Sequence, residues 1–193
     1  YTKYMNYLSL GELPNCQSLP IKNEFDLLQQ SVQTADPSAF MKAANLNGWS
    51  QGMSIMVQMY ATAQKQGAVS NGWHLLPRLH IILREFEASK NELNKWDGIK
   101  AQLGFSLFDQ NEAKSISNND FLVVAMSHAT KLNYLPLFDM WGLAVSDKAK
   151  LQVNQFGYPA TIKQVFAFEK DGYCYGLDMP TLAIDGIQTW PFN

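Results

Sequence analysis

Three histidines, His74, His80 and His128, are the first residues to test for chemistry, because imidazole is a common metal ligand and general base. Two imidazoles on a helix share a zinc ion when they stand four residues apart, with a carboxylate beside them to activate water. His74 and His80 are six positions apart, roughly 120° around a helix at about 100° per residue. The sequence contains no His-Glu-x-x-His, so we expect it to supply no catalytic residue and no metal ligand. His128 falls at helical spacing among apolar residues and is expected to be a partly buried, hydrogen-bonded histidine.

Cysteine chemistry would need a histidine close to Cys16 or Cys174, the only two thiols, and neither has one near it in sequence. An even count is compatible with one disulfide between them in an oxidising compartment, and two unpaired cysteines are equally consistent with the sequence. The sequence also lacks a glycine-rich phosphate loop with its lysine. Two close carboxylate pairs are expected to be solvated surface: Glu85 with Glu87, and Asp109 with Glu112.

Flat apolar rings suit sugar faces, so the five tryptophans could line a carbohydrate groove: Trp49, Trp73, Trp96, Trp141 and Trp190. Tryptophan is more often a core residue. Trp49 and Trp73 differ from the others because they stand at predicted helix starts, where an exposed ring is easier to place. These two are therefore the candidate substrate-binding residues.

Composition indicates a globular protein, with 47% hydrophobic and 12% aromatic residues in 193. The formal net charge of -2 and the scattered 15 Lys and Arg argue against a nucleic-acid partner, because phosphate binding needs a clustered basic surface. No apolar run approaches the roughly 20 residues of a spanning helix, so no membrane span is expected. The start at Tyr1 without a helix cap is what a piece of a longer polypeptide would show.

The elements that position these residues are expected to be helices, because apolar residues recur at helical spacing up to about residue 156. The helix near residues 120–131 is apolar on every side and is expected to be buried at the centre. Pro77 either kinks its helix or marks the first turn. Expected inward stripes include Leu75, Leu79, Ile82, Leu83 and Phe86 in one helix, and Leu93, Trp96, Ile99 and Leu103 in the next. The expected N-terminal caps are Asn23, Ser50, Ser70 or Asn71, Asn91, Asn119 or Asp120, and Ser146.

The character of the chain changes at residues 157–159. Two Asp-Gly pairs between β-rich runs predict two hairpins. The first joins residues 164–168 to 173–176, and the second joins 182–184 to 187–189. The predicted fold is therefore mainly α, a multi-helix bundle-like lobe over residues 1–156 with a small β-rich appendage over residues 157–193.

Several positions across the helical region together form a recognisable pattern. They are Gly72-Trp73, Leu75-Leu76-x-x-Leu79 and Arg84, then Asp120-Phe121-x-Val123-x-x-Ser127, and finally Asn133-Tyr134-Leu135-x-x-Phe138-x-x-Trp141-Gly142. This pattern resembles the C-terminal helical part of the enhancin-like (AcfD/SslE/ImpA-type) gluzincin zinc metallopeptidases. The resemblance covers roughly residues 1–153, and its most specific part is the ending from Asn133 to Gly142, in which Tyr134 is an insertion.

The resemblance implies a secreted enzyme, outside the cell or on a bacterial surface, that cleaves mucin-type glycoproteins with a zinc ion held upstream of the helical region. This sequence lacks that zinc motif, so no ligand and no general base carry over. We expect a helical lobe that is inactive by itself and whose partners are the remainder of the peptidase and the glycoprotein substrate. Four residues are expected to have structural roles, with Trp141 as a core residue and Gly142 as a helix cap: Asp120, Phe138, Trp141 and Gly142.

Two further readings stay open. The chain could be a non-enzymatic extracellular module that binds glycans or a protein through exposed tryptophans and amide-rich loops. It could also be a structural domain with no ligand.

Overall fold

The computed structural model describes residues 22–36, 38, 49–167, 181–183 and 187. Within these residues the chain forms eight α-helices and one two-stranded antiparallel sheet near the C-terminus, which confirms the mainly helical fold class. The chain divides into two compact units. Unit 1 comprises Tyr1–Trp73, Met140–Gly142 and Ile162–Asn193, and unit 2 comprises His74–Asp139 and Leu143–Thr161.

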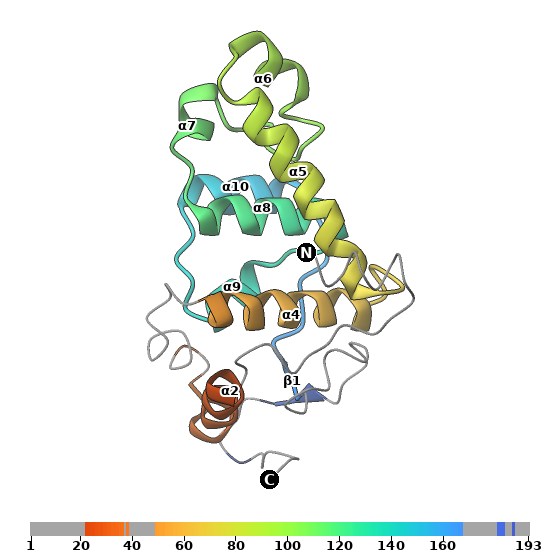
Figure 1. The fold of residues 1–193 in the computed structure, drawn as a ribbon, viewed down its shortest axis with the longest axis vertical. Helices are drawn as coiled ribbons and strands as arrows, with labels where there is room; N and C mark the ends of the chain where they lie inside the picture. Colours follow the sequence, from red (N-terminus) through yellow and green to blue (C-terminus); the bar gives the residue numbers. More distant parts are fainter. Residues whose placement is uncertain (1–21, 37, 39–48, 168–180, 184–186, 188–193) are drawn as a thin grey trace. The chain divides into compact units, whose positions relative to one another are not determined.

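Unit 2 is built on α8, whose buried residues include Val123, Val124, Ala125 and Met126, as the all-round apolar pattern predicts. Helices α5 and α10 both pack against α8, and Figure 1 shows α8 and α10 side by side. The helices of this unit, with only the last residue of α9 outside it, are α5 (Leu75–Ser89), α6 (Leu93–Ile99), α7 (Gln110–Lys114), α8 (Asn118–Thr130), α9 (Leu135–Met140) and α10 (Asp147–Gln155).

An aromatic cluster fills the core of unit 2 around Phe86. Its ring centroid lies 5.1 Å from that of Trp96, 4.9 Å from that of Phe105 and 5.0 Å from that of Phe121. The Trp96 indole Nε1 donates to the Phe108 carbonyl at 3.1 Å, so its polar edge is satisfied inside the core. This cluster fixes α5, α6 and the residues that follow α6 to one another.

The start of α8 differs from the expectation. Its N-cap is Ser117, whose Oγ accepts from the Asp120 backbone N–H at 3.1 Å, and neither Asn119 nor Asp120 caps it. Helix α10 does begin with the expected Ser146 cap, which accepts from the Ala149 N–H. Serine is a strong cap because its short side chain satisfies one free N–H of the first turn.

Of the expectations for α5 and α6, the first-turn place of Pro77 is confirmed, and the caps and stripes are corrected. Pro77 lies in the first turn of α5, after the 3₁₀ turn Gly72–His74. The stripe of α5 is narrower than expected, because Leu83 is 39% exposed. In α6 the preceding Glu92 occupies the cap position without a side-chain bond, and Leu93 is 55% exposed because it stands at the helix start.

Unit 1 holds α2 (Lys22–Thr34) and α4 (Trp49–Lys65), which pack against each other. Both begin one residue before the expected caps Asn23 and Ser50, which therefore lie inside the helices. In α4 the residues Ile55, Val57, Met59 and Tyr60 are buried, which is core packing. No helix in the described ranges is both long and apolar enough to cross a membrane.

The small sheet of unit 1 pairs β1 (Val165–Phe166) with β2 (Thr181–Leu182) in antiparallel register, Val165 opposite Leu182. This pairing joins the first arms of the two predicted hairpins to each other, and was not expected. The expected arm at 173–176, both Asp-Gly pairs and most of the expected arm at 187–189 lie outside the described residues. Helix α4 supports the sheet through Gln58, whose Oε1 accepts from the Phe166 N–H at 2.8 Å and whose Nε2 donates to the Phe166 carbonyl at 3.0 Å.

Candidate functional site

The histidines do not form a zinc site. Within the residues that the structure describes, no three His, Cys, Asp or Glu side chains come together so that they could hold a metal ion. His74 and His80 are exposed, and His128 is half-buried. A zinc site of the gluzincin type therefore does not fit the described residues.

His128 lies near the end of α8 against two other segments of unit 2. A Cβ built on Gly104 would lie 2.7 Å from the His128 Cγ, so the imidazole packs directly on that backbone. The ring centroid of His128 is 5.8 Å from that of Phe156. The expected partial burial is present, while Nδ1 is buried without a hydrogen-bond partner in the described part of the chain. Burial, followed by the positive charge of Lys131, lowers the pKa of His128, and a hydrogen bond to the Gln102 backbone partly opposes this.

Trp73 is half-buried in the 3₁₀ turn, with its ring edge-on to Tyr60 at 5.8 Å between centroids. The turn is held by the Trp73 N–H, which donates to Asn71 Oδ1 at 3.0 Å, and by the Gly72 N–H, which donates to Gln64 Oε1 at 2.9 Å. This ring is consequently held in place with part of its surface accessible. A fixed, partly exposed indole is the arrangement that sugar stacking requires.

The other tryptophans and the two cysteines offer no described side chain that could bind a ligand. Trp49 is the first residue of α4, but its side chain lies outside what the structure describes, as do Cys16, Cys174 and Trp190 in full. A disulfide between the two cysteines stays a prediction. Trp96 and Trp141 are fully buried and cannot stack on a ligand.

Asp120 is a buried carboxylate, 7% exposed, that reaches from the first turn of α8 to the start of α10. Its Oδ1 accepts from the Ser146 N–H at 2.8 Å. Beside it, the Asn119 Nδ2 donates to the Ala144 carbonyl at 3.0 Å. The start of α8 thus holds the segment that leads into α10, and this is a positioning arrangement with no reactive group directed at solvent.

The end of α9 is closed by Gly142, whose φ of +66° is a left-handed conformation that glycine adopts without strain. The Leu143 N–H then donates to the Phe138 carbonyl at 2.9 Å, which ends the helix. Phe138 and Trp141 are both buried. A Cβ on Gly142 would approach the Ser38 Cβ to 2.9 Å, so both the lack of space and the backbone conformation disfavour a side chain at this position.

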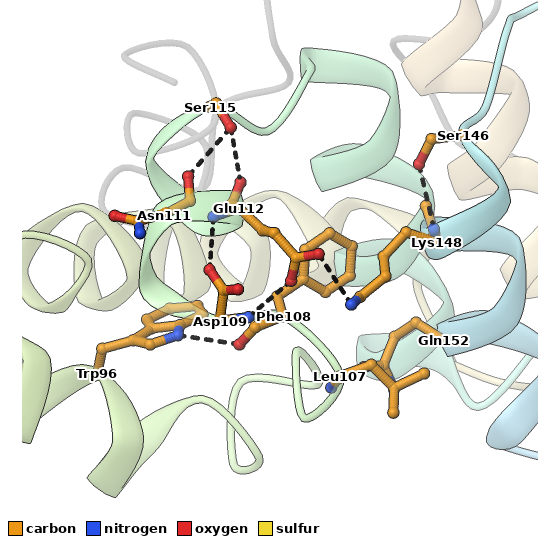
Figure 2. A network of polar contacts seen from close by, with 11 residues as sticks. Trp96, Leu107, Phe108, Asp109, Asn111, Glu112, Ser115, Ser146, Lys148 and Gln152 are labelled. Carbon is orange, nitrogen blue, oxygen red and sulfur yellow. Dashed lines mark hydrogen bonds and ion pairs between the residues drawn. The ribbon is translucent and has the colours of Figure 1, made fainter.

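A polar network of unit 2 connects α7 to α10 (Figure 2). Asp109 and Glu112 form a reciprocal capping box, in which each carboxylate accepts from the other's backbone N–H at 2.9 and 2.8 Å. Lys148 on α10 pairs with Glu112 at 2.9 Å. The bonds from Lys148 and from the Asp109 N–H hold the pKa of the Glu112 carboxyl below its ordinary value.

Gln152 anchors the neighbouring loop, because its buried Oε1 accepts from the Leu107 N–H at 2.8 Å. The carboxylates Asp109 and Glu112 are surface groups, but they are engaged in helix capping rather than free. Helix α7 was not among the expected elements, although Asp109-x-x-Glu112 is a capping-box signature that predicts it. The network fixes the fold and contains no nucleophile paired with a base.

The chain resembles one group of known proteins. No protein-family model matches the sequence. The immunomodulating metalloprotease of Pseudomonas aeruginosa is 26% identical over 126 residues, which are 63% of this chain and 13% of that protein. Two solved structures match over 99% of this chain and 22% of theirs at 21% identity. They are the IMPa metallopeptidase in complex with T-antigen, with a TM-score of 0.71, and IMPa from P. aeruginosa in complex with an O-glycopeptide, with a TM-score of 0.68.

The two kinds of similarity support each other. The alignment in sequence covers well over half of this chain, and the likeness in fold covers nearly all of it. Both cover only a minor part of the longer proteins. The chain is therefore a distant homologue of a segment of the IMPa immunomodulating metalloprotease.

Proposed function

We propose that this chain is the C-terminal helical lobe of a secreted zinc metallopeptidase that acts on mucin-type glycoproteins, and that it is not catalytic by itself. One observation carries the proposal: the likeness extends over 99% of this chain but over 22% of a metallopeptidase whose solved structures include T-antigen and an O-glycopeptide. A piece that matches so completely to so small a part is best explained as one lobe of such an enzyme.

The remainder of the peptidase then supplies the chemistry. Its zinc ion, zinc ligands and general base belong to residues outside this sequence, because the sequence has no His-Glu-x-x-His. The contribution of this lobe is a rigid surface, held by the aromatic core of unit 2 and by the bonds of Asp120 and Gln152. The site of action is outside the cell or at a bacterial surface.

The test is metal analysis and proteolysis on the purified 193 residues, with the P. aeruginosa IMPa as the positive control. We expect no stoichiometric zinc after dialysis and an intact O-glycopeptide at protein concentrations where the control cleaves it completely. About one zinc per chain together with cleavage would overturn the proposal that the lobe is inactive.

A second candidate function, an extracellular module that binds glycans, is favoured by the fixed and partly exposed ring of Trp73. Glycan binding by the isolated chain, weakened by Trp73→Ala or Trp49→Ala and retained by Trp73→Phe, would support it. A structural domain with no ligand is the outcome if neither proteolysis in the parent nor glycan binding is found.

A further inference from the structure

Three segments of unit 2 meet at the imidazole of His128: the end of α8, the 100–105 turn that follows α6, and the segment 154–158 that ends α10. The turn approaches through Gly104, whose φ of +91° and lack of a Cβ let its backbone lie against the ring. The third segment approaches through Phe156, which stacks on Tyr158 with centroids 5.1 Å apart. Lys131 lies next to this pair of rings, with its Nζ 5.3 Å from the Tyr158 ring centroid.

The junction is built for a neutral imidazole. The buried Nδ1 atom makes no hydrogen bond within the described residues, and the hydrogen bond between the imidazole and the Gln102 backbone is the smallest of the three influences on the pKa of His128. A buried and unpaired charged donor is costly because it loses its water. A second positive charge, Lys131, stands three residues later as the C-cap of α8.

The described carboxylates of α8, α5 and α10 are engaged with other partners, and in α10 Asp147 is paired with Lys150. In the 100–105 turn the charged group is Lys100, which is paired with Asp97 at 2.8 Å. In segment 154–158 the titratable group is the phenol of Tyr158, and in α8 the carboxylate of Asp120 is occupied by Ser146. Helix α5 also packs on α8, and its acids are paired, Glu85 with Arg84 and Glu87 with Lys90.

We propose that His128 is a pH-sensitive clasp: its protonation in mildly acidic solution releases the 100–105 turn and the Phe156–Tyr158 ring pair from the end of α8. The clasp is a conformational property of unit 2 and does not depend on the proposed role in a peptidase.

The direction follows from linkage. Burial and the Lys131 charge lower the pKa of His128 in the closed junction, while in the open junction it returns toward its ordinary value of 6.5. The open state therefore binds the proton more tightly. The closed state keeps its full advantage above about pH 6.5 and loses it as the pH falls toward the lowered pKa.

Amide hydrogen exchange measures the opening directly. The reporters are the N–H groups of Gly104, Phe105 and Gly157, which donate to the carbonyls of Ala101, Lys100 and Asn154. After correction for base-catalysed exchange, their opening equilibrium should rise as the pH falls from about 6.5, by at most about tenfold per pH unit. The Phe166 N–H, bonded to Gln58 in unit 1, is the internal reference and should show no such rise.

The variant His128→Phe keeps an aromatic ring at the junction and cannot titrate, so its opening should be independent of pH. The exposed histidines supply matched controls, and His74→Gln and His80→Gln should retain the full response. If His128→Phe does not fold, an NMR titration of the wild-type imidazole decides. A His128 pKa at or above 6.5, an unchanged opening in the wild type, or the same pH response in His128→Phe would each overturn the proposal.

Discussion

The replacement Gln58→Leu tests how α4 supports the small sheet. Gln58 is 1% exposed, and its amide makes both hydrogen bonds of the Phe166 backbone on that side, at 2.8 and 3.0 Å. Leucine has nearly the same helix propensity as glutamine, so α4 itself should be unaffected. The change instead leaves one buried N–H and one buried carbonyl without partners.

The magnitude follows from those two groups. Each buried unpaired backbone group costs about 1–3 kcal/mol, which gives about 2–6 kcal/mol for the pair. Burying a leucine in place of an amide offsets about 1–2 kcal/mol of this. The central values, about 4 and about 1.5 kcal/mol, give a net loss in free energy of unfolding of about 2.5 kcal/mol, with a lower urea midpoint and an unchanged m-value.

Gln66→Leu is the matched control, because it makes the same exchange of side chains in the same unit. Gln66 is half-buried, and its Oε1 accepts from the Ile162 N–H at 3.0 Å. Water can replace that acceptor, so the loss should stay below about 1 kcal/mol. Equal losses for the two variants, or a Gln58→Leu loss under about 0.5 kcal/mol, would refute the reasoning.

Three further substitutions are tested by the same urea unfolding. Trp141→Ala should cost about 3–5 kcal/mol because the indole is fully buried, and a loss below about 1 kcal/mol would show that it is not a core residue. Gly142→Ala should cost more stability than Gly67→Ala. Both glycines have positive φ, but of the two only a Cβ on Gly142 would meet a neighbour, the Ser38 side chain. Equal costs would show that this close approach to Ser38 does not matter. Tyr60→Phe should leave the free energy of unfolding unchanged or raise it by about 1 kcal/mol. The Tyr60 phenol has no hydrogen-bond partner in the described part of the chain, and burial raises its pKa. A clear loss of stability would reveal a partner.

The central helix was predictable because its signal is local. An apolar run on every side of a helix indicates burial, and residues Val123 to Met126 are buried. Its first residue was not predictable, because residues 117–120 are all plausible caps. What decides between them is the bond of Asp120 to the Ser146 N–H, 26 residues further along the chain, which local pattern does not show.

The sheet shows the same limit. Asp-Gly pairs report a local turn, whereas Val165–Phe166 pairs with Thr181–Leu182 and is supported by Gln58, 108 residues earlier than Phe166. The candidate site was only partly predictable from sequence. The exposure of the Trp73 ring follows from its place at a helix start, but its contact with Tyr60 and the junction around His128 depend on tertiary packing.

The most direct test of the proposed role is to sequence the gene that encodes this chain upstream of the codon for Tyr1. The proposal predicts an open reading frame that continues upstream and encodes His-Glu-x-x-His, with the glycine and the third zinc ligand of the gluzincin motif after it. An initiation codon directly before Tyr1, or an upstream frame without that motif, would contradict the proposal that this is one lobe of a zinc metallopeptidase.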